Sequence, residues 1–247
     1  FRRANDTFID VATDLAERAL RTALADAGLE PPDVDFVMFT SVTGISAPSV
    51  DALLVSRLGL RPDVKRLPSF GLGCVGGAAG IARVHDYLVG HPDQVGVLLS
   101  VELCSLTLQR DDETIANFVA TGLFGDGAAA CVLRSQEGGL AGIEFSGHHT
   151  WPGTLDIMGW SVDDTGLGVI FDRAIPPFAE ANMRPAVEGI LARHDLNIGD
   201  VDRFCCHPGG AKVITALERA LSLEQGNLDH ERTVLADYGN MSAPTAL

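Results

Sequence analysis

The sequence predicts an α/β layered fold in which two related α/β halves follow one another. Segments with the apolar periodicity of helices alternate with short apolar runs typical of buried strands. The chain has 247 residues, of which 46% are hydrophobic and 21% charged, a profile typical of a protein with a large packed core. The opening order of helix, turn and strand recurs after residue 174, where Asp33-Val34-Asp35 returns as Asp200-Val201-Asp202.

Periodicity and turn residues predict each element of the first half, residues 1–147. Residues 8–27 place apolar side chains at three- and four-residue steps and stop at Gly28, as an amphipathic helix does. Further helices are expected at 50–58, 75–90 and 114–121. Buried strands are expected at 36–40, 65–70 and 95–101, and a strand pair at 128–133 and 140–146, joined by Glu137-Gly138-Gly139.

The second half, residues 148–247, is expected to repeat part of this order. The segment 147–174 is rich in Gly, Trp, Asp and Thr, and we interpret it as a connection between the halves. The remaining pattern predicts helices at 176–194 and 210–221 and strands at 203–206 and 233–237.

The repeat places Gly73-Cys74 and Gly239-Asn240 at equivalent positions, each just past a predicted strand. His207 ends the strand that corresponds to 36–40. If a pseudo-twofold axis relates the halves, Cys74, His207 and Asn240 face one central cavity. A thiol at a helix N-terminus beside an imidazolium has a lowered pKa, so Cys74 is expected to be a thiolate at neutral pH. His207 and Asn240 can then donate hydrogen bonds to a developing oxyanion.

The glycines around Cys74 allow more than one interpretation. They predict a tight strand-to-helix turn that projects the thiol and leaves room for a substrate, as in a nucleophile elbow. Residues 71–76 also have the GxGxxG spacing, with Glu102 after the next strand, so a dinucleotide-binding protein is the alternative from another class. The order Cys, His, Asn would also suit a papain-like peptidase, but the glycine-rich setting and the repeat disfavour it. Asp126 lies between glycines and is expected to brace a loop.

Composition limits the possible partners. The formal net charge is −15, which disfavours nucleic acid and anionic membrane surfaces, and no apolar run approaches the roughly 20 residues that span a bilayer. Five cysteines without a CxxC pair predict neither a disulfide framework nor a zinc site, and indicate the reducing cytoplasm. The run Cys205-Cys206-His207 would place too few ligands on one side of a strand, so no metal site is expected.

Several motifs in a fixed order resemble the type III polyketide synthases, the chalcone-synthase-like branch of the thiolase-fold condensing enzymes. The resemblance covers nearly the whole chain and is closest to bacterial members that make alkylpyrones or alkylresorcinols. The motifs that carry it are Val64-Lys65-Arg66, Gly73-Cys74, Leu123-Phe124-Gly125-Asp126-Gly127-Ala128, His207-Pro208-Gly209-Gly210 and Tyr238-Gly239-Asn240-Met241-Ser242.

This resemblance implies a role for each site residue. Cys74 would carry the acyl group, His207 and Asn240 would form the decarboxylation and oxyanion site, and Phe124 would gate the cavity from the coenzyme A tunnel. Gly209, Gly210 and Lys212 stand where the family's loop meets coenzyme A, although Lys212 is not a family hallmark. Val42 and Cys104 replace cavity threonines of plant members, Val169 replaces a second gating Phe, and Ser242 also belongs to the cavity, so a more apolar cavity for fatty acyl starters is implied.

The resemblance also implies the reaction and the partners. An acyl-coenzyme A starter would load on Cys74, malonyl-coenzyme A would extend it by decarboxylative Claisen condensation, and cyclisation would give a pyrone or resorcinol type product. No metal or redox cofactor is implied, and a homodimer is expected. Complete family members carry more chain at both ends, so the layered αβαβα fold is expected to be truncated. A ketoacyl synthase III is the enzymatic alternative, disfavoured because that family has His-Gln-Ala-Asn where this chain has His207-Pro208-Gly209-Gly210.

Overall fold

A computed structural model describes every residue except 137. Its main sheet has the strand order β2-β1-β3-β4, formed by β1 (Phe36–Thr40), β2 (Lys65–Ser69), β3 (Val95–Leu103) and β4 (Asp126–Arg134). β1 is parallel to both β2 and β3, whereas β4 is antiparallel to β3. The carboxyl ends of β1, β2 and β3 therefore lie at one edge of the sheet, where ligand sites of α/β folds commonly form.

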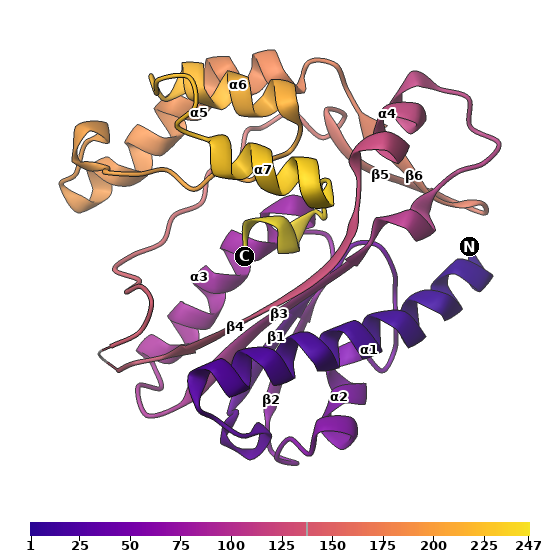
Figure 1. Cartoon of the computed structure of the whole chain (residues 1–247), viewed down its shortest axis with the longest axis vertical. Helices are drawn as coiled ribbons and strands as arrows, with labels where there is room; N and C mark the ends of the chain where they lie inside the picture. The colour runs from indigo at the N-terminus through magenta and orange to yellow at the C-terminus, as the bar shows by residue number, and fades with distance from the viewer. Residues whose placement is uncertain (137) are drawn as a thin grey trace.

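Helices cover both faces of this sheet (Figure 1). Helices α1 (Arg2–Ala27) and α2 (Val50–Leu58) pack on one face, and α3 (Gly76–Val89) packs on the other. All five residues of β1 are buried because both faces are covered. Strand alternation directs Val37 and Phe39 toward α1 and α2, while Phe36 and Met38 point toward α3.

The second half of the chain contains a hairpin and three longer helices. Strands β5 (Met158–Asp163) and β6 (Gly166–Phe171) form an antiparallel pair near α4 (Ile115–Leu123). Helices α5 (Ile175–Leu191), α6 (Ala211–Ala220) and α7 (Asp229–Tyr238) follow, and the last turn of the chain, Ala243–Ala246, lies against α3 (Figure 1). A small core of Ile214, Leu217 and Leu228 joins α6 to the chain that leads into α7.

The predicted repeat is visible in the turn that follows the first helix of each half. A 3-10 turn at Pro31–Asp33 is closed by a capping box, in which the backbone and side chain of Glu30 form reciprocal hydrogen bonds with those of Asp33. The same capping arrangement joins Asn197 and Asp200 around the turn Ile198–Asp200. Here the similarity ends, because β1 follows the first turn and, among the described residues, no strand follows the second.

Most first-half elements occur where the sequence predicts them. Strand β1 and helix α2 have the expected bounds, and the other helices and strands shift by a few residues at their ends. The expected strand at 140–146 is wrong: β4 pairs with β3, and 140–146 forms no strand. Residues 140–144 are exposed instead of packing on the sheet. The connection expected between these two strands, residues 137–139, lies partly outside the described residues, because residue 137 is not described.

Three second-half expectations are also wrong. Residues 203–206 are not a strand, because no described strand lies beside them to complete a hydrogen-bonded ladder. Residues 233–237 belong to helix α7. The segment 147–174 is more than a connection, because it contains the β5–β6 hairpin, whose turn is closed by Asp163 accepting a 2.8 Å hydrogen bond from the backbone N–H of Thr165.

Within the described residues, no helix combines the length and the apolar character that crossing a bilayer requires.

Candidate active site

A cavity of about 640 Å³ lies between the N-terminal end of α3, the carboxyl ends of β1 and β2, and the β5–β6 hairpin. Its volume falls within the range of about 300–1,000 Å³ typical of ligand sites, and its walls are mostly apolar with a few polar groups. Three glycines, at 71, 73 and 159, complete the lining. The other lining residues are Val42, Thr43, Phe70, Leu72, Cys74, Val75, Cys104, Phe124, Met158, Trp160, Val162, Val169, Ile170, His207 and Ser242.

Cys74 lies in a 3-10 turn, Gly73–Val75, that runs directly into α3. The turn begins at Gly73 with φ +59°, a left-handed conformation that glycine adopts without strain. The two glycines after Val75 allow close packing of neighbouring segments, whereas the sequence analysis expected them to leave room for a substrate. A Cβ at Gly77 would lie 2.5 Å from the carbonyl oxygen of Ala243, and one at Gly76 would lie 2.9 Å from Oγ1 of Thr40. Their small size lets the C-terminal turn lie beside Cys74.

Asn240 is fully buried and fixed by both its backbone and its side chain. Its N–H donates to the carbonyl of Leu123 at 2.8 Å, and its carbonyl accepts from the N–H of Gly125 at 3.0 Å. Its Oδ1 accepts from the N–H of Ser242 at 2.8 Å, and its Nδ2 donates to the carbonyl of Gly209 at 3.4 Å. Asn240 thus links the segment after α4 to the segment that contains His207.

His207 lines the same cavity from the segment that precedes α6. Neither ring nitrogen has a hydrogen-bond partner among the described residues, although both are buried. The backbone around it is held instead: the N–H of Gly209 donates to the carbonyl of His207 at 2.9 Å, and the N–H of Cys206 donates to Oε1 of Glu231 at 3.0 Å. The ring nitrogens are therefore free to exchange hydrogen bonds with a bound molecule.

The expectation of a thiolate beside an imidazolium is wrong for this structure. Burial lowers the pKa of His207 to about 4, so its imidazole is neutral at pH 7. Burial also raises the pKa of the Cys74 thiol, and the side chains of Ser242 and Asn240 offset this increase only in part. Desolvation in an apolar cavity disfavours the charged form of both groups, which favours a neutral thiol and a neutral imidazole.

The structure brings most of the sequence-predicted residues to this cavity. Cys74, His207 and the five expected cavity residues, Val42, Cys104, Phe124, Val169 and Ser242, all line it. Asn240 lies beneath the surface behind Ser242. Gly209, Gly210 and Lys212 do not line the cavity: Gly210 precedes the first residue of α6, and Lys212 is exposed on that helix.

The β5–β6 hairpin supplies cavity residues that sequence reasoning missed. Met158, Trp160 and Val162 alternate along β5 and line the cavity, and Trp160 is paired with Val169 of β6. On the same strand, Phe171 packs edge-to-face on Phe124, with 6.1 Å between the ring centroids. The sequence did contain a signal for this hairpin, because apolar residues alternate on either side of an Asp-rich turn that ends in glycine.

Glu102 and Asp126 are both committed to internal contacts. The carboxylate of Glu102 accepts hydrogen bonds from the backbone N–H of Val42 and from the hydroxyls of Ser41 and Thr43. This burial does not suit the exposed acidic residue that binds ribose in a dinucleotide site. Asp126 accepts from the N–H and the hydroxyl of Ser105, at 2.8 and 2.6 Å, which confirms that it braces a loop.

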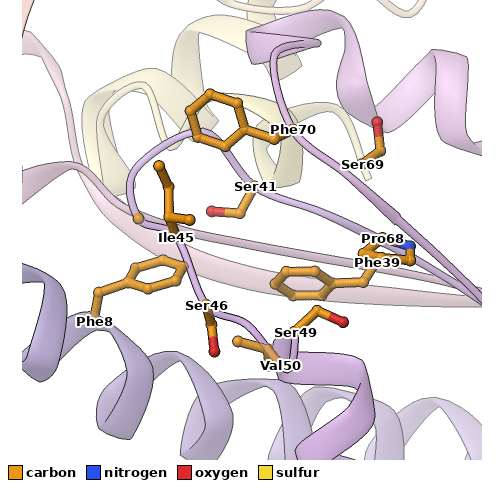
Figure 2. Close-up of a pocket in the computed structure, with 11 residues that line it drawn as sticks. Phe8, Phe39, Ser41, Ile45, Ser46, Ser49, Val50, Pro68, Ser69 and Phe70 are labelled. Atoms are coloured by element: carbon orange, nitrogen blue, oxygen red, sulfur yellow. The ribbon is translucent and has the colours of Figure 1, made fainter. Parts of the chain in front are cut away.

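A second, smaller hollow of about 110 Å³ adjoins the main cavity. Figure 2 shows Phe8, Phe39 and Val50 around its lower part, with the Phe70 ring and Ser41 above. Phe70 lines both hollows, and its side chain is 53% exposed. Phe70 and the loop that follows β1 therefore form the wall between the two spaces.

Comparison with known proteins agrees with this geometry. The profile of the N-terminal domain of chalcone and stilbene synthases matches residues 2–137, and that of the C-terminal domain matches residues 143–247. A 1,3,6,8-tetrahydroxynaphthalene synthase of Streptomyces peucetius subsp. caesius is 48% identical over 100% of this chain and 67% of its own length. A putative chalcone synthase of Bacillus subtilis (strain 168) is 36% identical over 100% of this chain and 71% of its own length.

Solved structures give the same result. The crystal structure of 1,3,6,8-tetrahydroxynaphthalene synthase from Streptomyces coelicolor A3(2), a bacterial type III polyketide synthase, superimposes with a TM-score of 0.95 at 29% identity, covering 99% of this chain and 70% of that one. The chain thus spans about two thirds of the length of the relatives it matches. These similarities give no support to the ketoacyl synthase III alternative. The chain belongs to the chalcone and stilbene synthase family, the type III polyketide synthases.

Proposed function

We propose that Cys74 is the acyl-carrying nucleophile of this synthase and that His207 and Asn240 promote decarboxylation and stabilise oxyanions. The observation that carries the proposal is that Cys74 and His207 line one apolar cavity and that Asn240 lies directly behind its wall. Asn240 joins the walls that hold them through Ser242 and Gly209. A thiol, an imidazole and an amide suit acyl transfer followed by carbon–carbon bond formation.

In the loading step, the Cys74 sulfur attacks the carbonyl carbon of an acyl-coenzyme A. Because the thiol and the imidazole are both neutral, the thiol proton passes to His207 as the new thioester forms. The carbon–sulfur bond to coenzyme A breaks, and the coenzyme A thiolate takes the proton back from His207. The products are acylated Cys74, free coenzyme A and a neutral imidazole.

In the extension step, malonyl-coenzyme A binds with its thioester carbonyl facing His207 and Asn240. Loss of carbon dioxide leaves an enolate, whose oxygen accepts hydrogen bonds from His207 as a donor and from Nδ2 of Asn240. The enolate carbon attacks the Cys74 thioester, a carbon–carbon bond forms, and the Cys74 sulfur leaves as a thiolate that takes up a proton from solvent. The product is a coenzyme A thioester longer by two carbons, ready to reload on Cys74 or to cyclise.

The product we propose first is a polyhydroxylated aromatic of the kind named for the relatives, with malonyl-coenzyme A as starter and extender. Its support is the 48% identity to a 1,3,6,8-tetrahydroxynaphthalene synthase. A second candidate, a pyrone or resorcinol type product from a fatty acyl starter, is favoured by Val42, Cys104 and Val169, which give the cavity an apolar lining. A relative from Mycobacterium tuberculosis, 28% identical, is named for α-pyrone synthesis.

Mass spectrometry of products formed with malonyl-coenzyme A, alone and with short- and long-chain acyl-coenzyme A, tests both candidates. Aromatic product from malonyl-coenzyme A alone supports the first candidate, and products that retain an added acyl chain support the second. Radiolabelled acyl-coenzyme A tests the nucleophile. Wild type and the exposed-thiol control Cys205→Ser should retain covalent label, and Cys74→Ala should lose it. Label on Cys74→Ala, or a single-step ketoacyl product on an acyl carrier protein, would contradict the proposal.

Coenzyme A contact is proposed at the start of α6, where the backbone of Gly209 and Gly210 leads to the exposed Lys212. A helix N-terminus and an ammonium both attract phosphate groups. The steps above are complete with coenzyme A thioesters, so no further cofactor is proposed. A reducing cytoplasm is proposed because the chemistry needs a free thiol and because all five cysteines are unpaired.

A homodimer is proposed through the edge of the main sheet. β2 is an edge strand, and its first four residues are exposed. Leu67 and Phe70 are 44% and 53% exposed, and Ile45 on the neighbouring loop is 50% exposed. The unpaired backbone groups of an exposed edge strand can pair with another chain, and a second copy of this strand is the complement we propose.

A further inference from the structure

The loop between β1 and α2, residues 41–49, borders both hollows of the site. Val42 and Thr43 line the main cavity, and the next two residues, Gly44 and Ile45, line the smaller hollow. The position of this one loop therefore sets the shape of both spaces. The contacts that fix it have no part in the reaction steps proposed above.

Asn5 of α1 holds this loop through two reciprocal hydrogen bonds. Its Nδ2 donates to the carbonyl oxygen of Ile45 at 2.8 Å, and its Oδ1 accepts from the N–H of Ile45 at 2.8 Å. One side-chain amide thus makes both hydrogen bonds that a residue of a neighbouring antiparallel strand would exchange with Ile45. An ionised Asp has the same length but no donor, so the pair requires the amide of Asn.

Phe8 supports the same loop nearly one turn further along α1. Asn5 and Phe8 share one face of the helix, because residues three apart are neighbours on a helix surface. The Phe8 ring is buried in the main core, and a Cβ at Gly44 would lie 2.1 Å from its Cγ. The loop backbone therefore packs directly on the ring at the residue before the Asn5–Ile45 pair.

A second anchor holds the start of the loop. The carboxylate of Glu102 on β3 accepts from the N–H of Val42 at 3.1 Å and from the Thr43 hydroxyl at 2.8 Å. Glu102 is completely buried, whereas Asn5 is only partly buried and lies outside the buried face of α1. A substitution of Asn5 therefore releases the loop at one end and leaves the core of α1 and the inner anchor intact.

We propose that Asn5 is a positioning residue of the synthase, which fixes the loop at Ile45 and thereby limits the length of the acyl chain that the main cavity admits. The proposal rests on the proposed loading of an acyl group on Cys74. With the Asn5–Ile45 pair intact, the loop keeps Val42 and Thr43 in the cavity wall. Without the pair, the loop can move into the free space of the smaller hollow, about 110 Å³, and the main cavity gains room beside Val42.

Hydrogen–deuterium exchange of the Ile45 amide, followed by NMR, tests the loop contact itself. Within the described residues, Oδ1 of Asn5 is the one acceptor for this N–H. In Asn5→Ala we expect the amide to exchange about tenfold faster than in wild type, because the hydrogen bond that protects it is lost. The matched control Thr7→Ala removes a hydroxyl that bonds only within α1, to the carbonyl of Arg3 at 3.1 Å, and should exchange as wild type does. Equal exchange in wild type and Asn5→Ala would overturn the proposal.

The second measurement is the rate at which Cys74 acquires label from short-chain and from long-chain radiolabelled acyl-coenzyme A. In Asn5→Ala we expect the ratio of the long-chain rate to the short-chain rate to rise about tenfold, the discrimination that one methylene commonly produces in an apolar pocket. General damage to the fold would lower both rates together and leave their ratio unchanged, and that result would overturn the proposal. Thr7→Ala should keep the wild-type ratio.

The two measurements separate this proposal from the proposed reaction. Absence of label on wild type with every acyl-coenzyme A would contradict loading on Cys74, and the limit on chain length with it. The exchange of the Ile45 amide requires no substrate, so it decides the loop contact in either case.

Discussion

Gly44 shows how the absence of one side chain positions the wall of the cavity. A Cβ at this residue would lie 2.1 Å from Cγ of Phe8, whose ring is only 1% exposed and belongs to the main core. With a Cβ at residue 44, the ring would have to leave its place in the core. The loop that carries Val42 and Thr43 therefore approaches α1 closely only with glycine at residue 44.

Gly44→Ala is expected to destabilise the fold by about 1–3 kcal/mol, the usual cost of overpacking a core. Urea unfolding measures the change as a lower transition midpoint with an unaltered slope. The matched control is Gly189→Ala in α5, where a Cβ meets nothing within 4 Å. Alanine favours a helix over glycine, so the control should gain roughly 0.5–1 kcal/mol. Equal midpoints for the two variants would show that the loop adapts.

Helix α7 shows how an element is decided by its partners. The run Val234-Leu235-Ala236 is too short for its periodicity to distinguish helix from strand. In the structure, Nη2 of Arg232 lies 2.6 Å from Oε2 of the buried Glu218 on α6. Arg232 lowers the pKa of Glu218 to about 2, assisted by the backbone N–H groups of Gly226 and Leu228. This ion pair anchors α7, and Gly239 then ends the helix just before Asn240.

Arg232→Ala should cost about 3 kcal/mol of unfolding free energy, because it leaves the Glu218 carboxylate buried without its cation. The loss should be present at pH 7 and should shrink as the pH falls from about 4.5 through about 2, where Glu218 becomes protonated in the native state. Arg219→Ala is the matched control, since its contact with Glu180 is 3.4 Å long and exposed, and its cost should stay below about 1 kcal/mol. Urea unfolding at several pH values compares the variants, and equal costs would exclude a special role for the buried pair.

At the scale of the whole molecule, the main sheet presents one open edge. Strand β2 pairs with β1 on one side, and no described strand lies on its other side. Arg66 on this strand is linked to the buried Asp51 of α2 at 2.8 Å, so the edge is held in place although it is exposed. A rigid edge with unpaired backbone groups and the exposed Leu67 suits strand pairing with a second copy.

Leu67→Glu places a charge in the middle of that edge, so it should shift the synthase from dimer to monomer in sedimentation equilibrium. The matched control is Val89→Glu, at an exposed residue at the end of α3, which should leave the dimer intact. A wild type that sediments as a monomer, or a Leu67→Glu variant that still dimerises, would contradict pairing through β2.

The sequence by itself determined the first-half helices and the strands β1 to β4, because local periodicity and glycine stops specify them without distant partners. It also indicated Cys74, His207 and Asn240 as neighbours, since a repeat and a set of motifs are linear features. Tertiary structure alone decided the secondary structure of residues 203–206 and 233–237. A strand needs a neighbouring strand to complete its hydrogen bonds, and a helix needs a surface on which to bury its apolar face. The tertiary structure also decided the protonation of Cys74 and His207 and the enclosure of Glu102. Burial depends on what surrounds a group in space, and no spacing along the chain records it.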